Sequence, residues 1–306
     1  MSNPPGADFE PHRRHLRALA YRMLGSRAEA EDLVQDCWLR WRDADRPQIE
    51  QPRAWLTRVA TNLCLDRLQS ARARRESYVG VWLPEPLIDD DSAAYDAGPE
   101  ARADYAQQVS IAFLLALQRL SPLERAAFLL HDVFDLGFDE VAQRLGRSAA
   151  ACRQLASRAR GHVQAGQARV EVQQEEADRL LQAFAQAVAA GKVDALAEAL
   201  ADDVVFLSDG GGKASAVPRP VHGAAQAARV FIGFARLWDP QLHPARPARI
   251  NGLPGIVLAD ATGQVLQTVA LQLGRAPDGR PEVSAIYVTR NPDKLAPLQS
   301  LLKTAA

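Results

Sequence analysis

Six polar side chains near one predicted helix have the types and spacing that proteins use to read DNA. They are Arg147, Ser148, Arg153, Gln154, Ser157 and Arg158. The helix is expected over residues 149–163, about 22 Å long, which suits a major groove about 12 Å wide. Residues 147–169 hold five arginines and no acid, so the field there attracts phosphate. Taken alone, the pattern also fits a solvated, arginine-rich helix of a bundle.

A second polar group lies on a helix expected to begin near Pro52. Its members are Arg53, Arg58, Asn62, Asp66 and Arg67, with Trp55 beside them. Guanidinium, amide and aromatic groups together can hold an unstacked base. Residues 11–78 contain 14 Arg against nine Asp and Glu, so this segment is basic. The alternative is a solvated face with its tryptophans in the core.

An acidic stripe is expected on the helix before it. Asp32, Gln35 and Asp36 recur at near-helical spacing, while the neighbouring Leu33 belongs to the apolar stripe. Such a stripe is either an interaction surface or ordinary solvated surface.

The elements that position these groups are helical. Apolar residues at helical spacing predict three helices between His12 and Arg75, with Ser26 as a cap for the second. The run Ser121-Pro122-Leu123-Glu124 predicts a further helix start with a capping box. Residues 138–145, a turn at 146–147 and residues 149–163 then have the form of a helix-turn-helix.

The segment between the two helical groups differs in composition. From residue 79 to 104 it carries seven acids against Arg102 alone, with several Gly and Pro, which indicates an acidic linker. The linker contains Trp82, Leu83, Pro84, Glu85 and Pro86. A solvated tether has little reason to carry Trp and Leu, so a docked segment is favoured over an indifferent one.

The C-terminal half is predicted to be an α+β domain. Two helices are expected over residues 173–200, followed by short apolar runs at 204–207, 248–250, 255–258, 265–273 and 283–289 that predict an antiparallel sheet, with one helix at 224–234. Asp203, Asp209 and His222 are the candidates for acid–base chemistry, but no spacing supplies a persuasive pair. We therefore expect no catalysis. A glycine run, Asp209 to Lys213, predicts a close approach of another chain segment.

Composition bounds the class of protein. The 306 residues are 47% hydrophobic and 24% charged with a net charge of −1, which fits two or three globular domains and argues against disorder. The three cysteines are far apart, so we expect neither a zinc site nor a disulfide framework. The N-terminus has no signal-peptide pattern and no apolar run reaches membrane-spanning length, so we expect a cytoplasmic protein.

The two helical segments resemble a known family. Leu24-Gly25-Ser26, then residues 30–36, then Pro52-Arg53-Ala54-Trp55-Leu56 with Asn62, Leu63, Asp66 and Arg67, look like region 2 of extracytoplasmic-function (ECF) sigma factors. Residues 121–160 resemble their region 4. Residues 82–86, the run Asp209, Gly210, Gly211, Gly212, Lys213, and the run Asn291, Pro292, Asp293, Lys294, Leu295 resemble three signatures of a subgroup with a fused SnoaL-like domain, the group-41 type.

The resemblance implies a multi-domain fold and a function. Two all-α sigma domains, a region 2 bundle and a region 4 helix-turn-helix, would precede an α+β NTF2-like domain. The implied boundaries are 1–78 for region 2, 79–108 for the linker, 109–168 for region 4, 173–290 for the SnoaL-like domain and 291–306 for a tail. The implied function is promoter-specific transcription initiation by an alternative sigma factor.

The resemblance also assigns roles to the polar groups. Region 4 would read the −35 element through the six residues at 147–158, and region 2 would receive the melted −10 element on Arg53, Arg58, Asn62, Asp66 and Arg67. Asp32, Leu33, Gln35 and Asp36 would contact the β′ coiled coil of core RNA polymerase, and the β flap is a further implied contact. Leu155 stands where many relatives carry Arg, so a phosphate contact there is not expected.

The fused domain has an implied regulatory role. Its three signatures are expected to make intramolecular contacts that regulate the sigma domains in cis, so no separate anti-sigma factor is expected. We expect no cofactor, no metal and no membrane partner. The alternative is a bifunctional regulator whose C-terminal cavity senses or turns over a small molecule.

Overall fold

The computed structural model of the chain describes residues 5–76, 78–88, 108–164, 172–236 and 245–299. Most of the acidic linker and the end of the tail therefore lie outside the described residues. The chain divides into two compact units, one of residues 1–77 and 112–167, the other of residues 78–111 and 168–306. The linker segment next to Trp82 thus groups with the C-terminal domain in the second unit.

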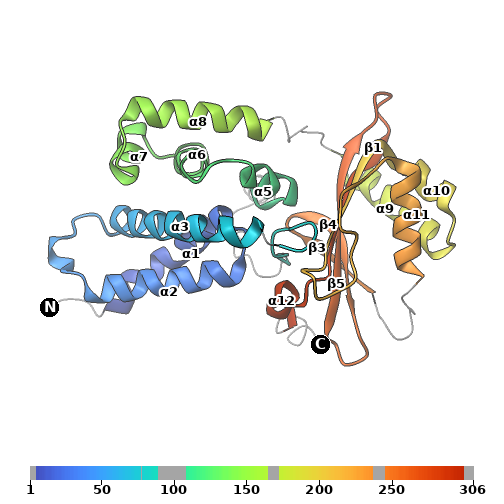
Figure 1. The fold of residues 1–306 in the computed structure, drawn as a ribbon, viewed down its shortest axis with the longest axis horizontal. Helices are drawn as coiled ribbons and strands as arrows, with labels where there is room; N and C mark the ends of the chain where they lie inside the picture. Colours follow the sequence, from blue (N-terminus) through green and yellow to red (C-terminus); the bar gives the residue numbers. More distant parts are fainter. Residues whose placement is uncertain (1–4, 77, 89–107, 165–171, 237–244, 300–306) are drawn as a thin grey trace. The chain divides into compact units, whose positions relative to one another are not determined.

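Unit 1 is all-helical, and short turns join the helices inside each of its two helical groups, residues 5–76 and 111–164 (Figure 1). They are α1 (Pro5–Leu24), α2 (Arg27–Asp43), the 3-10 turn η1 (Arg46–Gln48), α3 (Pro52–Glu76), α5 (Ile111–Gln118), α6 (Pro122–Phe128), the π-helical turn η4 (Leu129–Val133), α7 (Phe138–Leu145) and α8 (Ala149–Gln164). α1 begins before the predicted start at His12. The buried Phe9 packs edge-on against Trp38 and holds this additional part of the helix.

Local signals set the ends of these helices. Ser26 accepts a hydrogen bond from the Glu29 amide at 3.1 Å and caps α2. Ser121 and Glu124 form the capping box predicted for α6. Gly146 ends α7 with φ +62°, a conformation that favours glycine, and so makes the turn of the helix-turn-helix.

The two sigma-like helical groups pack together within unit 1. Arg125 of α6 is buried, and its Nη1 donates to the carbonyl of Met23 at the end of α1 over 2.5 Å. Arginine is favourable there because carbonyls at a helix C-terminus lack partners and carry partial negative charge. His15 of α1 lies edge-on to Phe134, with ring centroids 5.0 Å apart.

Unit 2 is an α+β domain, and the fold class predicted from the sequence is confirmed. Its elements are α9 (Gln174–Ala189), α10 (Val193–Glu198), β1 (Leu200–Asp209), β2 (Val221–His222), α11 (Ala224–Ala235), β3 (Ala245–Ile250), β4 (Leu253–Ala259), β5 (Val265–Arg275), β6 (Pro281–Thr289), α12 (Pro292–Leu295) and the 3-10 turn η5 (Ala296–Leu298). Helices α9, α10 and α11 cover one face of the sheet, and α12 lies at its other face (Figure 1). Phe206, Val269 and Ile286 anchor the core under the helices.

The sheet is mixed, which corrects the prediction of a purely antiparallel one. Its strand order is β2-β1-β6-β5-β4-β3, and β1 runs parallel to β6. A parallel pair needs a long crossover, and here most of the domain separates the two strands in sequence. The two-residue β2 was not predicted, because so short a strand leaves no apolar pattern.

Candidate functional site

The six predicted DNA-reading side chains lie at or before α8, and all are exposed. Three of them, Arg153, Gln154 and Ser157, share the helix face opposite the buried Cys152 and Ala156. Because α8 buries only its small apolar side, the polar face remains available to a nucleic acid. Leu155 is half-buried, as its apolar side chain requires.

The predicted −10 residues do not all share one surface. Arg58, Asn62 and Asp66 recur every four residues and form an exposed stripe on α3, and Arg53 is exposed at the start of this helix. Arg67 instead turns toward α2. Its two Nη atoms donate to Asp36 Oδ2 and to the Glu29 carbonyl, each over 2.6 Å, so Arg67 joins the two helices.

The predicted polymerase-contacting residues on α2 divide in the same way. Asp32 and Gln35 are exposed, and Asp36 is partly engaged by Arg67. Leu33 is fully buried in the core of unit 1, so its prediction as a surface contact is wrong, because it belongs to the apolar stripe of the helix. The sequence reasoning passed over Leu39, one turn further along the exposed face, whose side chain is 44% exposed.

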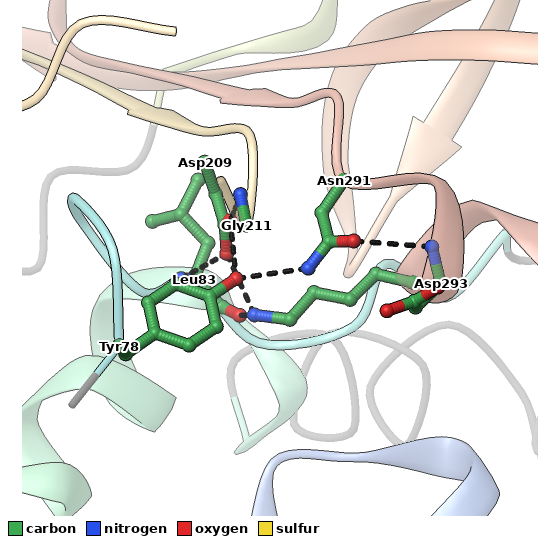
Figure 2. A network of polar contacts seen from close by, with 7 residues as sticks. Tyr78, Leu83, Asp209, Gly211, Asn291 and Asp293 are labelled. Atoms are coloured by element: carbon green, nitrogen blue, oxygen red, sulfur yellow. Dashed lines mark hydrogen bonds and ion pairs between the residues drawn. The ribbon is translucent and has the colours of Figure 1, made fainter. Parts of the chain in front are cut away.

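The three runs that the sequence analysis singled out around residues 82, 209 and 291 meet in unit 2, in a network that we call the latch (Figure 2). At its centre is Asp209, which ends β1 and is fully buried. Its Oδ1 accepts from the Tyr78 hydroxyl at 2.5 Å and the Gly211 amide at 3.0 Å. Its Oδ2 accepts from the Leu83 amide at 2.8 Å and Lys294 Nζ at 2.6 Å. Four donors thus compensate the loss of water around this carboxylate.

Lys294 of α12 is the buried cation of the latch. Its Nζ pairs with Asp209 and also donates to the carbonyl of Leu83. The ammonium lies 4.2 Å from the Trp82 ring centroid and 5.1 Å from that of Tyr78. Trp82 belongs to the linker and Tyr78 directly precedes it, so cation–π attraction adds to the ion pair in holding this segment on the domain.

Asn291 completes the latch from the start of α12. Its Nδ2 donates to the Tyr78 hydroxyl at 2.9 Å, and its Oδ1 caps the helix by accepting from the Asp293 amide. Burial, and then the Asp209 hydrogen bond, raise the pKa of Tyr78, so its hydroxyl stays a donor at neutral pH. Outside this buried network, Lys213 forms an exposed ion pair with Asp293 at 2.6 Å.

Gly211 allows the close approach that the latch needs. Its φ is +60°, and a Cβ there would lie 2.2 Å from Asn291 Nδ2. Gly210 and Gly212 are tight in their own ways, since their Cβ positions would meet Ala214 and Val79. Packing against Asn291 of the tail and Val79 of the linker therefore requires Gly211 and Gly212, and the fold of the loop itself requires Gly210.

A second clamp, which sequence reasoning missed, holds the linker at Asn251. This fully buried residue has φ +53° in the β3–β4 turn. Its Oδ1 accepts from the Leu87 amide at 3.0 Å, its own amide donates to the Leu87 carbonyl at 2.8 Å, and its Nδ2 donates to the Val109 carbonyl at 2.8 Å. Asn251 thus binds both Leu87 within the linker and Val109 directly after it. The only signal was the dipeptide Asn251-Gly252, which predicts a hairpin turn but no partner.

The rest of the linker run is buried as well. Pro84, Glu85 and Pro86 have little exposed surface, and Leu83 is fully buried. Strand alternation places Asp209 on the sheet face opposite Phe206, which packs under the helices. Residues 82–86 of the linker therefore dock on the face that α9, α10 and α11 leave uncovered.

The residues considered for acid–base chemistry do not come together. Asp203 and His222 are exposed on β1 and β2, whereas Asp209 is enclosed by the latch on four hydrogen bonds. Within the described ranges, no group of three or more His, Cys, Asp and Glu has a geometry that could hold a metal ion. The three cysteines are buried and free, and burial raises the pKa of the Cys37 thiol to about 12.

Among the helices that the structure describes, none is long and apolar enough to cross a membrane.

Comparisons with known proteins find relatives of both helical groups and of the whole chain. Residues 9–74 match the family model for sigma-70 region 2, and residues 110–163 match that for sigma-70 region 4. The chain is 39% identical to the ECF RNA polymerase sigma factor SigJ of Mycobacterium tuberculosis, over 94% of this chain and 92% of that protein. It is 32% identical to the probable ECF sigma factor SigI of the same species, over 98% of each. The crystal structure of M. tuberculosis SigJ aligns with a TM-score of 0.71 and 35% identity, covering 95% of this chain and 98% of that one.

Proposed function

The chain belongs to the ECF RNA polymerase sigma factors, and we propose that its C-terminal domain controls initiation by holding the linker between regions 2 and 4. As a member of that family it directs promoter-specific transcription initiation, with RNA polymerase and promoter DNA as its partners. The proposal concerns how the individual surfaces contribute and how the fused domain acts on them.

For region 4, the proposal assigns reading of the −35 element to the exposed face of α8. Arginine can pair bidentately with guanine, and Gln and Ser can reach base edges or phosphates. The exposure of the six residues at 147–158 supports this role. Region 4 would meet the β flap through another of its surfaces.

For region 2, the proposal assigns binding of the melted −10 element to the α3 stripe of Arg58, Asn62 and Asp66, together with Arg53. Arg67 would act indirectly, because it joins α3 to α2 through Asp36. Asp32, Gln35 and Asp36 would face the β′ coiled coil. Leu39 would supply the apolar centre that a protein interface needs, since polar groups alone at a rim contribute little affinity.

The single observation that carries the regulatory proposal is the buried ion pair between Asp209 and Lys294, with the Leu83 amide and carbonyl held in the same network. Its members come from the linker, the first strand and the tail. Releasing the linker requires these groups to separate, so the C-terminal domain can set when regions 2 and 4 take up the polymerase-bound arrangement. Such control in cis requires no separate anti-sigma factor.

In this proposal the C-terminal domain is regulatory, and the protein acts in the bacterial cytoplasm, where core polymerase is found. The use of Asp209 as a structural anchor supports this, because four hydrogen bonds leave the carboxylate no capacity to act as a base toward a substrate.

The test is binding of the labelled full-length chain to bacterial core RNA polymerase, followed by fluorescence anisotropy. We expect submicromolar affinity for the wild-type chain and a different affinity for Trp82→Ala, which removes a ring from Lys294. Trp82→Phe keeps an aromatic ring there and serves as the matched control. Absence of binding by the wild-type chain would contradict the polymerase contacts, and equal affinities of wild type and Trp82→Ala would contradict regulation through the linker.

A further inference from the structure

Three arginines of α8 are each engaged by a side chain from a different preceding element of unit 1. Arg153 lies over the ring of Phe138 from α7, 5.6 Å from its centroid. Arg158 Nε donates to Glu124 Oε1 of α6 at 2.9 Å. Arg160 pairs with Asp132 of the π-helical turn η4 through Nε at 2.5 Å and Nη2 at 3.3 Å. Side chains of the preceding elements therefore restrain the arginines of α8.

Glu124 is the partner with two tasks. It is the third residue of α6, where its Oε2 accepts from the amide and hydroxyl of Ser121 at 3.1 and 2.7 Å. The other oxygen takes Arg158. Burial opposes ionisation of Glu124, but the hydrogen bonds from Ser121 and Arg158 prevail and lower its pKa. The helix dipole at the start of α6 also favours the charge. The hydrogen bonds with Ser121 thus fix the orientation in which the carboxylate of Glu124 contacts Arg158.

The contact uses the Nε–H of Arg158 and not its forked edge. A guanidinium pairs bidentately with guanine or phosphate through two parallel N–H groups. Glu124 accepts from the Nε–H, so the N–H groups on the two Nη atoms can still form such a pair. The Arg158 side chain remains 58% exposed while Glu124 is only 17% exposed. The acid thus restrains the arginine without covering it.

We infer that Glu124 is a specificity-determining positioning residue for DNA reading by α8, an inference that rests on the proposed −35 role of this helix. The carboxylate holds Arg158 in one orientation, which favours a base contact that depends on direction. Its negative charge also offsets one positive charge of the helix, which weakens attraction to phosphates of any sequence. Both effects raise the ratio of specific to non-specific affinity.

The contrast with Asp132 supports the choice of Glu124. Asp132 binds Arg160 through Nε and Nη2 together, which occupies one side of its fork. Arg158 is held through a single nitrogen and is among the residues whose positions on the helix suit base reading. Arg158, which is proposed to recognise a base, is therefore held through Nε alone. Arg160, which is not among the proposed DNA-reading residues, is paired through two nitrogens.

The test uses Glu124→Gln in the full-length chain, assembled with bacterial core RNA polymerase. Glutamine can replace glutamate in a capping box, so the substitution removes the charge and keeps the helix start. The probes are a duplex selected by the wild-type holoenzyme from a random-sequence pool and a scrambled duplex of equal composition. We expect the affinity ratio between them to fall about threefold, the scale of an exposed ion pair. Because one more phosphate contact forms without discrimination, the salt slope of scrambled-duplex binding should steepen by about one.

Two further variants decide the interpretation. Ser121→Ala removes the hydroxyl that binds Oε2 of Glu124 but keeps the charge and the contact between Oε1 and Arg158, so it should lower the ratio less than Glu124→Gln does. In an Arg158→Gln background, Glu124→Gln should have a much smaller effect on the ratio, because there is no arginine left to orient. An equal effect in that background, or reproduction of the effect by Ser121→Ala, would overturn the inference. If Arg158→Gln alone leaves the ratio unchanged, it is the −35 role of α8 that fails, which distinguishes the two failures.

Discussion

The exposed face of α8 and the buried latch both consist of charged side chains, yet the two regions hold them in opposite ways. Arg158 is 58% exposed and has one carboxylate beside it, whereas Asp209 is fully buried and accepts four hydrogen bonds. An exposed pair contributes little to stability, because water solvates each partner almost as well. A buried pair cannot lose one member without leaving an unpaired charge in a poorly solvated place.

The difference teaches which functions the two regions can serve. Charges on α8 can exchange their partners for phosphate at little cost, so they suit a surface that binds and releases DNA. Opening the latch would require several groups to separate together, which suits the proposed two-state control. The comparison therefore predicts large, salt-insensitive effects in the latch and small, salt-sensitive ones on α8.

The largest effect is expected for Asp209→Asn, which leaves the buried Lys294 without an anion. We expect the docked linker to lose about 3 to 5 kcal/mol, as for other buried pairs that lose one partner. The measurement is the rate at which a protease cuts the linker, since cleavage reports the population of the open form.

The matched control for that substitution is Asp203→Asn on the same strand, where the carboxylate is exposed. It should leave the cleavage rate unchanged. Equal sensitivity of both variants to the protease would show that burial of the Asp209 pair does not distinguish the two positions.

A second large effect is expected for Gly211→Ala. The added Cβ would fall 2.2 Å from Asn291 Nδ2 at a backbone φ of +60°. We expect about 2 to 3 kcal/mol lost from the free energy of unfolding of the C-terminal domain, measured by urea denaturation. Gly279→Ala has a similar φ of +86° but no atom within 4 Å, so it should cost only about 1 to 2 kcal/mol. A larger loss for Gly279→Ala would contradict the close packing inferred for the latch.

Acid should destabilise unit 1 through the half-buried His15 of α1. Burial, and then the charge of Arg53, lower the pKa of His15 to about 4, from an ordinary value near 6.5. Between pH 4 and pH 6.5 the unfolded chain binds more protons than the folded chain does. The contribution of His15 to the free energy of unfolding is therefore fully present above pH 6.5 and is lost as the pH falls from 6.5 through 4. We expect a loss of about 2 kcal/mol at pH 5.

The measurement for His15 is urea denaturation from pH 7.5 to 4.5, with His15→Gln expected to flatten the dependence on pH. The exposed His162 of α8 provides the control, because His162→Gln should keep the wild-type dependence. If both variants behave alike, the acid sensitivity comes from other groups.

The smallest effect is expected for Leu39→Ala, which changes an exposed apolar side chain of α2. Affinity for core polymerase should fall about fivefold, with no change in unfolding free energy and little dependence on salt, because no charge is involved. Leu39→Met keeps the apolar volume and should bind normally. Unchanged affinity of the alanine variant would remove Leu39 from the interface.

Local features of unit 1 could be predicted from the sequence, because caps and turns act within about four residues. Ser26 and Ser121 begin their helices and Gly146 ends one, as their residue types predict. The family prediction is confirmed by the relatives, and the fold class by the structure. The exposed face of α8 followed from helical periodicity alone.

Contacts between distant segments could not be predicted in the same way. The parallel pairing of β1 with β6 depends on the sheet as a whole, and nothing near Asn251 indicates that it binds Leu87 and Val109. Leu33 was predicted to contact polymerase because its polar neighbours in the sequence lie on the exposed face of α2, but its own side chain is buried in the core. The roles of the site residues remain predictions that the experiments above test.

Hydrogen exchange at the Leu83 and Leu87 amides of the full-length chain tests most directly the claim that the C-terminal domain holds the linker. These amides donate to Asp209 and Asn251, so both should exchange slowly in the wild-type chain. In Asp209→Asn, exchange at Leu83 should accelerate more than at Leu87, which Asn251 still binds. Rapid exchange of both amides in the wild-type chain would contradict the account.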